Sequence, residues 1–138
     1  MKLVRLSLLS VLFAILSCFQ ASAQLVGNKY IPGDYATITL AVADVNTLGV
    51  GAGGVTFNIA AGYTETISAT IALTATGTSA NPIVFRKDPG TSGVNPLITA
   101  YTGGVGTPAT AIQDGIWRMQ GSDYVTIDGI DLRDNPSN

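Results

Sequence analysis

The chain has 138 residues and is mildly acidic, with seven lysines and arginines, nine aspartates and glutamates, no histidine and a single cysteine. This composition excludes intramolecular disulfides, imidazole or multi-thiolate metal sites, and any nucleophile that relies on a histidine base. The excess of acidic residues disfavours nucleic acid and acidic lipid surfaces as partners.

The N-terminal residues have the pattern of a secretory signal peptide. Lys2 and Arg5 form a short basic start, residues 6–19 form an apolar run broken only by serines and a cysteine, and residues 21–23 read Ala-Ser-Ala. This pattern predicts cleavage after residue 23, with residues 1–23 as the signal peptide. The protein is then secreted or held at the cell surface, with no membrane span after cleavage. Two alternatives stay open, an uncleaved anchor helix and a lipidated Cys18 at the mature N-terminus.

The mature chain of 115 residues has the size of one domain. Cleavage removes two basic residues, so five basic and nine acidic side chains remain, with a net charge of −4. The cysteine is lost as well. An exported chain of this kind must gain its stability from backbone pairing and apolar packing rather than from disulfides.

The first element that the sequence predicts is an amphipathic helix over residues 35–48. Asp34 is placed as the N-cap, apolar residues from Ile38 to Leu48 recur at helical spacing, and Gly49 follows where a left-handed residue ends a helix. A strand is the alternative, because alternate residues are also apolar, but it would put Asp44 on the apolar face. Residues 24–50 are therefore assigned to a polar N-terminal segment and this helix.

From residue 51 onward the sequence favours short strands separated by turns, because it is rich in glycine, threonine and small apolar residues and lacks helical periodicity. The predicted strands lie in VTFNI, ISATIAL (taken as one loose strand), PIVFR, PLITAY, GIWRMQ and YVTIDGIDL. The groups that begin at residues 55, 82 and 116 are 27 and 34 residues apart, with one or two strands between them. Such a period indicates a solenoid.

The segment YVTIDGIDLRD breaks the two-residue rhythm of a strand. Val125 and Ile127 are two apart, the next large apolar residue is Ile130, and Leu132 restores the spacing. If all four side chains point into one core, the Asp-Gly pair at 128–129 must turn the chain through a corner without reversing it, for which glycine supplies a positive φ. The alternative is a β-hairpin with a tight turn at the same pair.

Four motifs follow one another in the mature chain: the helical GDYATITLAVADVNTLG, then VTFNIAAGYTE, then NPIVF, and then WRMQGSDYVTIDGI. In this order they resemble the N-terminal part of right-handed parallel β-helix domains of the pectin-lyase-like kind, which occur in large bacterial surface and secreted proteins. The resemblance covers essentially the whole mature chain. It implies a mainly β fold in which the helix caps the first rung, a rung being one coil of the solenoid.

The resemblance also implies a longer protein, since members of the family extend for several hundred residues. Residues 51–138 are therefore expected to be the first rungs of a truncated parallel β-helix. The last rung would then expose unpaired backbone groups, which predicts edge-to-edge association at an open C-terminal rung. The expected function is that of a non-catalytic surface or secreted segment with an adhesive, structural or glycan-contact role, whose partners are polysaccharides or other cell-surface components.

The alternative function is the front part of a polysaccharide lyase or glycoside hydrolase whose active site lies beyond residue 138. No catalytic residue is assigned in the chain itself. Asp128, Asp131 and Asp134, close to Arg118 and Arg133, are weak candidates for a Ca²⁺ site, since carboxylates bind this cation, but solvated side chains on strands and turns explain them better.

Two further sets of side chains are weighed. Glu65, the sole glutamate, has no second carboxylate beside it in the sequence, so it is expected to cap a turn or face solvent rather than to run a two-carboxylate mechanism. Trp117, Tyr101 and Tyr124 could stack on sugar rings, although a core position is favoured for the tryptophan.

Overall fold

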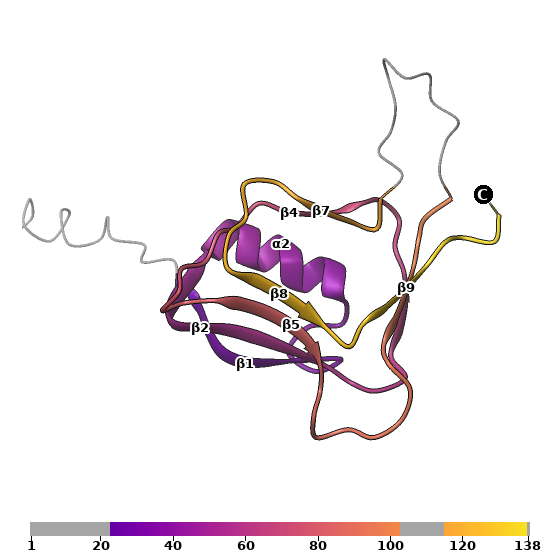
Figure 1. The fold of residues 1–138 in the computed structure, drawn as a ribbon, viewed down its shortest axis with the longest axis horizontal. Helices are drawn as coiled ribbons and strands as arrows, with labels where there is room; N and C mark the ends of the chain where they lie inside the picture. The colour runs from indigo at the N-terminus through magenta and orange to yellow at the C-terminus, as the bar shows by residue number, and fades with distance from the viewer. Residues whose placement is uncertain (1–22, 103–114, 138) are drawn as a thin grey trace, which may run out of the picture.

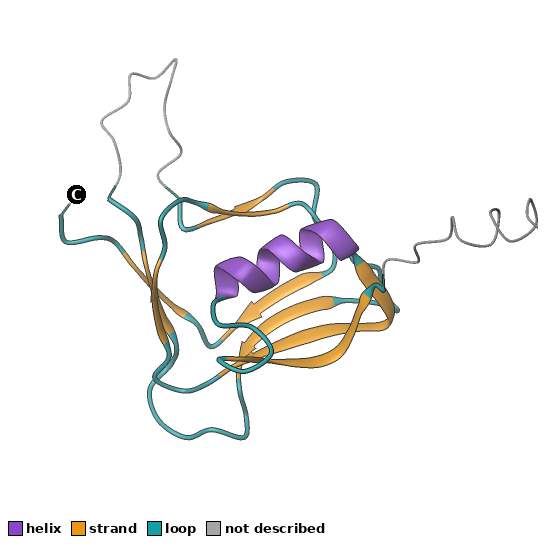
Figure 2. Ribbon diagram, turned by 180° about the vertical axis from the view of Figure 1, so that it is seen from behind, coloured by secondary structure: helices purple, strands orange, loops and turns teal. Residues whose placement is uncertain are grey.

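We describe the fold from a computed structural model, in which residues 23–102 and 115–137 are described. The predicted signal peptide, with Cys18, lies outside the described residues except for Ala23. The described residues form a mainly β structure of nine strands and one helix (Figures 1 and 2). In chain order the elements are β1 Leu25–Ile31, α2 Ile38–Leu48, β2 Val50–Ile59, β3 Thr64–Thr66, β4 Ile71–Leu73, β5 Ile83–Lys87, β6 Leu97–Thr99, β7 Trp117–Met119, β8 Val125–Asp128 and β9 Asp131–Arg133.

The strands form three parallel sheets. Sheet A has the order β1-β2-β5-β8, sheet B has the order β3-β6-β9, and sheet C pairs β4 with β7. After α2 the chain passes from sheet A to sheet B to sheet C twice, and then again from sheet A to sheet B. We call each passage a circuit: the first is β2-β3-β4, the second is β5-β6-β7 and the third is β8-β9.

The corner predicted at residues 128–129 is present. Strand β8 pairs with β5 and strand β9 pairs with β6, both in parallel, so the two strands on either side of the corner belong to different sheets. Gly129 has a φ of 63°, as this corner requires. The hairpin alternative is wrong, because a hairpin would pair β8 and β9 with each other in antiparallel fashion.

Helix α2 begins three residues later than the sequence predicted, and its N-cap is Thr37 rather than Asp34. The Thr37 side chain accepts a hydrogen bond of 3.1 Å from the amide of Leu40. Asp34 is engaged elsewhere, since its carboxylate accepts a hydrogen bond of 2.8 Å from the amide of Tyr30. The C-terminal end is as predicted, with Gly49 at a φ of 71°.

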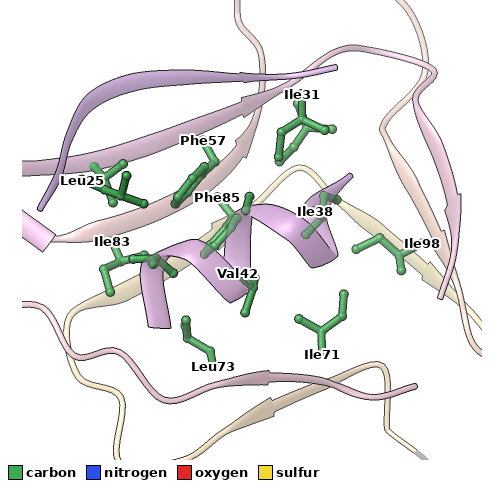
Figure 3. Close-up of a cluster of buried hydrophobic side chains, with 14 of the residues drawn as sticks. Leu25, Ile31, Ile38, Val42, Phe57, Ile71, Leu73, Ile83, Phe85 and Ile98 are labelled. Carbon is green, nitrogen blue, oxygen red and sulfur yellow. The ribbon is translucent and has the colours of Figure 1, made fainter. Parts of the chain in front are cut away.

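The helix closes one end of the interior. In Figure 2 it lies in front of the space between the sheets, and in Figure 1, seen from the other side, β8 lies in front instead. Its buried residues, Ile38, Ala41, Val42 and Val45, belong to the apolar face that the helical periodicity predicted, and the fifth member of that face, Leu48, is partly buried. Figure 3 shows Ile38 and Val42 among apolar side chains of the sheets.

The core is formed by side chains that repeat at the same register from one circuit to the next. Phe57 of β2 pairs with Phe85 of β5, and the two rings stack with centroids 4.6 Å apart and an interplanar angle of 12°. Neither phenylalanine is exposed to solvent. Such in-register parallel stacking puts like side chains above one another, so the sheets and the core stabilise each other.

The third circuit is less buried than the sequence analysis implied. Ile127 pairs with Phe85 and Leu132 pairs with Ile98, so both share the inward face of their sheets, yet they are 37% and 51% exposed. Val125 and Ile130 are partly buried and pack against the core. The expected direction of all four side chains fits the register, but no described strand lies on the far side of the third circuit to cover Ile127 and Leu132.

Three strand assignments need correction. Strand β1 was missed: the segment read as polar pairs in parallel with β2. The segment ISATIAL does not form one strand, because β3 ends at Thr66 in sheet B and β4 begins at Ile71 in sheet C. GIWRMQ is not the third member of the series that begins at residues 55 and 82, since β7 lies in sheet C and β8 takes that place in sheet A. Sheet positions therefore differ from what strand spacing alone suggested.

Candidate functional site

The outer face of sheet A carries a row of polar side chains. The residues Tyr30, Asn58, Arg86 and Asp128 are register partners on the four successive strands. Each directly follows or precedes a residue of the inward face, so alternation along the strand places it on the outer face. We call these four residues the outer row. Neighbouring strands are about 4.8 Å apart, so a phenol, an amide, a guanidinium and a carboxylate follow one another at that interval, and the amide of Asn58 is buried.

Two members of the outer row hold each other in place. The Nε atom of Arg86 donates a hydrogen bond of 2.9 Å to Oδ1 of Asn58, and Nδ2 of Asn58 donates one of 3.2 Å to Oδ1 of Asn28. Asn58 is only 3% exposed, so the central amide of this network is shielded from water, whereas Arg86 is half-buried and Asn28 is exposed. Since the bond to Asn58 uses only Nε, the terminal amino groups of a pre-oriented Arg86 are left to donate to a ligand.

The sequence analysis missed the outer row. Tyr30 was hidden in the segment that was read as polar, and it is 47% exposed at the edge of the sheet. A signal for the other members is nevertheless present, because VTFN, IVFR and VTID have the same pattern of two inward apolar residues followed by a polar one. Aligning these three segments would have brought Asn58, Arg86 and Asp128 together.

Glu65 lies at the N-terminal end of helix α2, where it binds backbone amides. Its Oε2 atom accepts a hydrogen bond of 2.7 Å from the amide of Ile38, and its Oε1 atom accepts one of 3.2 Å from the amide of Thr39 and another from the Thr39 hydroxyl. The side chain is 8% exposed. A carboxylate that satisfies the free amides at a helix N-terminus is stabilised by them and by the helix dipole. Glu65 is thus a helix cap provided by β3, not a solvent-facing side chain.

The hydroxyl of Tyr63 completes this cap. It donates to Oε2 of Glu65 over 2.9 Å. Burial, followed by the hydrogen bond to Glu65 and the charge of that carboxylate, raises the pKa of Tyr63 well above its usual value. Tyr35 lies in the segment between β1 and α2 and behaves similarly. Burial and the hydrogen bond to Asp44 raise its pKa to about 12. Both phenols are therefore donors at neutral pH.

The aromatic residues proposed for sugar stacking occupy different environments. Trp117 packs edge-on against Phe85, with ring centroids 5.1 Å apart, and this contact agrees with the core position favoured from the sequence. Tyr101 is also partly buried against the core. Tyr124 is 58% exposed but lies just before β8, outside the outer row. None of the three residues belongs to the outer row.

The acidic residues weighed as Ca²⁺ ligands lie on both sides of the corner between β8 and β9 and beyond it. Asp128 belongs to sheet A, Asp131 begins β9 and accepts a hydrogen bond of 3.0 Å from the Asn95 amide, and Asp134 follows β9. Across residues 23–102 and 115–137, no three acidic, histidine or cysteine side chains gather in a way that could hold a metal ion. The calcium site stays a prediction, with Asp128 the only one of the three in the outer row.

Comparison of the chain with protein-family models, with curated proteins and with solved structures gave no match. No helix within the described part of the chain is long and apolar enough to cross a membrane. The functional argument therefore depends on the geometry of the sheets and of the outer row.

Proposed function

We propose that the chain is an exported, non-catalytic segment of a right-handed parallel β-helix that contacts neutral glycans through the outer row. The single observation that carries the proposal is the register of sheet A, which aligns Tyr30, Asn58, Arg86 and Asp128 across four strands. The role is adhesive or structural rather than chemical.

The β-helix part of the proposal is supported by the order of the sheets. Two complete circuits through three parallel sheets, followed by a third through two of them, are what a coiling chain produces. Connections between parallel strands of one sheet are right-handed in nearly all proteins, which favours the right-handed coil. Each circuit then corresponds to one rung, and α2 caps the first.

The glycan part of the proposal is supported by the chemistry of the outer row. An exposed tyrosine offers an aromatic face for the apolar face of a sugar ring, and the Arg86 guanidinium offers donors for sugar hydroxyls. Polar groups fixed on strands lose little conformational freedom on binding, because Asn58 already holds Arg86. A polysaccharide that runs across the four strands would meet Tyr30, Arg86 and Asp128, while the buried Asn58 holds Arg86 from beneath.

Charge favours neutral over acidic sugars. Asp128 is the register neighbour of Arg86, so its carboxylate lies beside the one guanidinium of the outer row. The mature chain also has an excess of four acidic side chains. Both features repel a ligand that carries carboxylates or sulfates. The row holds one carboxylate, whereas glycoside hydrolysis by acid and base requires two, which supports a binding role rather than a catalytic one.

A glycan array with the purified, labelled chain tests the proposal. We expect retention on neutral polysaccharides in preference to uronic acid polymers, and no release of reducing or unsaturated sugar ends from either. Tyr30→Ala should weaken binding by about tenfold, the equivalent of a lost aromatic contact. Tyr124→Ala, which removes an exposed tyrosine outside the row, is the matched control and should bind normally. Equal loss in both variants, or no retention by the parent chain, would contradict the glycan proposal.

Export is tested separately by the intact mass of the protein recovered outside the cell. A chain that begins at Gln24 is expected, since the Ala-Ser-Ala triplet at 21–23 suits signal peptidase. A mass that includes Cys18 with acyl chains would replace cleavage after residue 23 with lipidation.

A further inference from the structure

Among the described strands, three at one end of the molecule have an outer edge that no other strand pairs, two in the third circuit and one in the second. Strand β8 is the edge of sheet A, β9 is the edge of sheet B and β7 is the edge of sheet C. Their inward side chains include Ile127, Leu132 and Met119, which are 37%, 51% and 44% exposed. From these edges we infer that the chain forms a two-fold dimer in which β8, β9 and β7 of two copies pair with each other. The inference depends on the sheet arrangement alone and not on glycan contact.

The backbone groups available at β8 belong to the residues with inward apolar side chains. The amide of Ile83 donates a hydrogen bond of 3.0 Å to the carbonyl of Tyr124. Since successive residues of a strand point their backbone groups in opposite directions, Tyr124 and Thr126 face β5. The N–H and C=O groups of Val125 and Ile127 therefore point away from the sheet, toward an additional strand.

The same relationship holds at the other two edges. In sheet B, the amide of Asp131 donates to Pro96 and the carbonyl of Arg133 accepts from Ala100, so the groups of Leu132 point outward. In sheet C, the carbonyl of Ile116 accepts from Ile71 and the amide of Gln120 donates to Leu73, which leaves the groups of Trp117 and Met119 pointing outward by the same alternation. One partner that pairs with all three edges would thus also cover the exposed apolar side chains.

The opposite end of the molecule is not available for such pairing. Helix α2 lies against β4, and Glu65 of β3 is bound to the first residues of the helix. The remaining edge strand, β1, has a register shift after Leu25 and carries Lys29 on the same face as Ile31. Irregular register and an inward-facing charge are features that protect an edge strand from pairing. Inward positions of β8, β9 and β7 carry no charge.

A second copy is the occupant that these observations favour. Since only one end can pair, two copies must meet with like ends, and a two-fold axis makes all facing strands antiparallel. An axis through sheet A would pair β8 with β8 of the second copy, and β9 with β7 of the second copy. Such a contact closes on itself, so assembly stops at the dimer.

The side chains suit this pairing. On β8, Val125 opposite Ile127 of the second copy brings inward apolar residues together, and it leaves Thr126 opposite its own equivalent. Between β9 and β7, alignment of Leu132 with Trp117 of the second copy puts Asp131 opposite Arg118, so opposite charges meet on the outer face. Cross-strand pairs of these kinds stabilise antiparallel sheets.

Sedimentation equilibrium of the purified chain provides the first test. We expect the mass of a dimer that dissociates on dilution. Ile127→Lys places a charge on the inward face of the edge and should give half that mass. The matched control is Leu40→Lys, which changes a similarly exposed apolar residue on the helix, at the other end, and should leave the dimer intact. Circular dichroism of both variants must match that of the parent chain.

Cross-linking tests the two-fold axis without depending on the lysine variant. In a Cys18→Ser background, Thr126→Cys should form a disulfide-linked dimer on mild oxidation, because non-hydrogen-bonded antiparallel pairs have Cα atoms about 4.5 Å apart, within the range that a disulfide spans. Thr56→Cys occupies the equivalent outer position on β2, inside the sheet, and should stay monomeric on denaturing gels.

Three results would overturn the inference. A monomer at all concentrations would do so and would indicate further β-strand polypeptide as the occupant of the open edges. Open-ended assemblies larger than a dimer would exclude the closed two-fold contact. A dimer in which Thr126→Cys and Thr56→Cys cross-link equally would exclude pairing through β8.

Discussion

The Glu65 carboxylate lies at the N-terminus of helix α2, where Oε2 accepts a hydrogen bond of 2.7 Å from the amide of Ile38. The two residues are 27 positions apart, and they belong to the first circuit and to the helix that closes it. Together with Thr37, which binds the amide of Leu40, Glu65 satisfies the amides of the first helical turn. A single buried side chain thus fixes how the cap sits on the sheets.

Replacing Glu65 should destabilise the protein strongly. Glu65→Ala leaves the amide of the buried Ile38 and the neighbouring amide of Thr39 without their partner, so we expect the free energy of unfolding to fall by about 2–3 kcal/mol. Glu65→Gln retains one acceptor oxygen but not the charge, and it should cost about half as much. Urea unfolding measures both changes. Asp88→Ala is the control. It removes a carboxylate that accepts a hydrogen bond from the amide of Gly90 in an exposed turn, and it should have a smaller effect than either Glu65 variant.

Stability should also decrease in alkaline solution. The pKa values of Tyr35 and Tyr63 are raised in the folded protein, that of Tyr35 to about 12. A tyrosine in the unfolded chain has a pKa of about 10. Above that pH the unfolded chain loses phenolic protons that the folded chain retains, so the free energy of unfolding falls as pH rises toward the folded values. Below it, both states are protonated and the contribution is fully present.

Denaturant unfolding from about pH 8 to about pH 11 tests this dependence. The double variant Tyr35→Phe, Tyr63→Phe should be less stable at neutral pH, because it loses the bonds to Asp44 and Glu65, but its stability should decline less steeply with pH. Tyr30→Phe, a change at an exposed tyrosine, is the control. An unchanged slope in the double variant would show that other groups govern the alkaline loss.

The phenylalanine pair in the core predicts a large effect of truncation. Phe85 stacks on Phe57 and makes an edge-on contact with Trp117, and it is fully buried. Phe85→Ala should lower the free energy of unfolding by about 3–5 kcal/mol, since it removes both contacts and leaves a cavity. Val84→Ala, on the outer face of the same strand, should cost clearly less. Comparable losses at the two positions would show that β5 has the opposite facing.

The sequence predicted the features that depend on interactions between residues close together in the chain. The helix, its buried face and Gly49 were predictable because they depend on local periodicity and local caps. The corner at Gly129 was predictable because the apolar spacing slips there by one residue. These features need no knowledge of which strands become neighbours.

The sequence did not predict features that depend on distant partners. The helix start moved to Ile38 because Glu65, from a later strand, occupies the first turn. Strand β1 was hidden because its two buried residues, Leu25 and Ile31, lie at its two ends with no alternation between them, and pairing with β2 fixes its conformation. The outer row is likewise visible only when the register of sheet A is known. Such nonlocal pairings leave little trace in a single sequence.

The facing of the third circuit can be tested with two neighbouring residues. Ile130 is partly buried and packs against the core, whereas Asp131 is exposed and bonds to Asn95. Ile130→Asp should therefore lower the free energy of unfolding by about 2 kcal/mol or more, because an unpaired carboxylate enters apolar surroundings. Asp131→Asn retains an acceptor oxygen for the Asn95 amide and should change stability by less than about 0.5 kcal/mol. Urea unfolding of the two variants measures this contrast, and equal tolerance at both positions would mean that the chain leaves the corner with the opposite face inward.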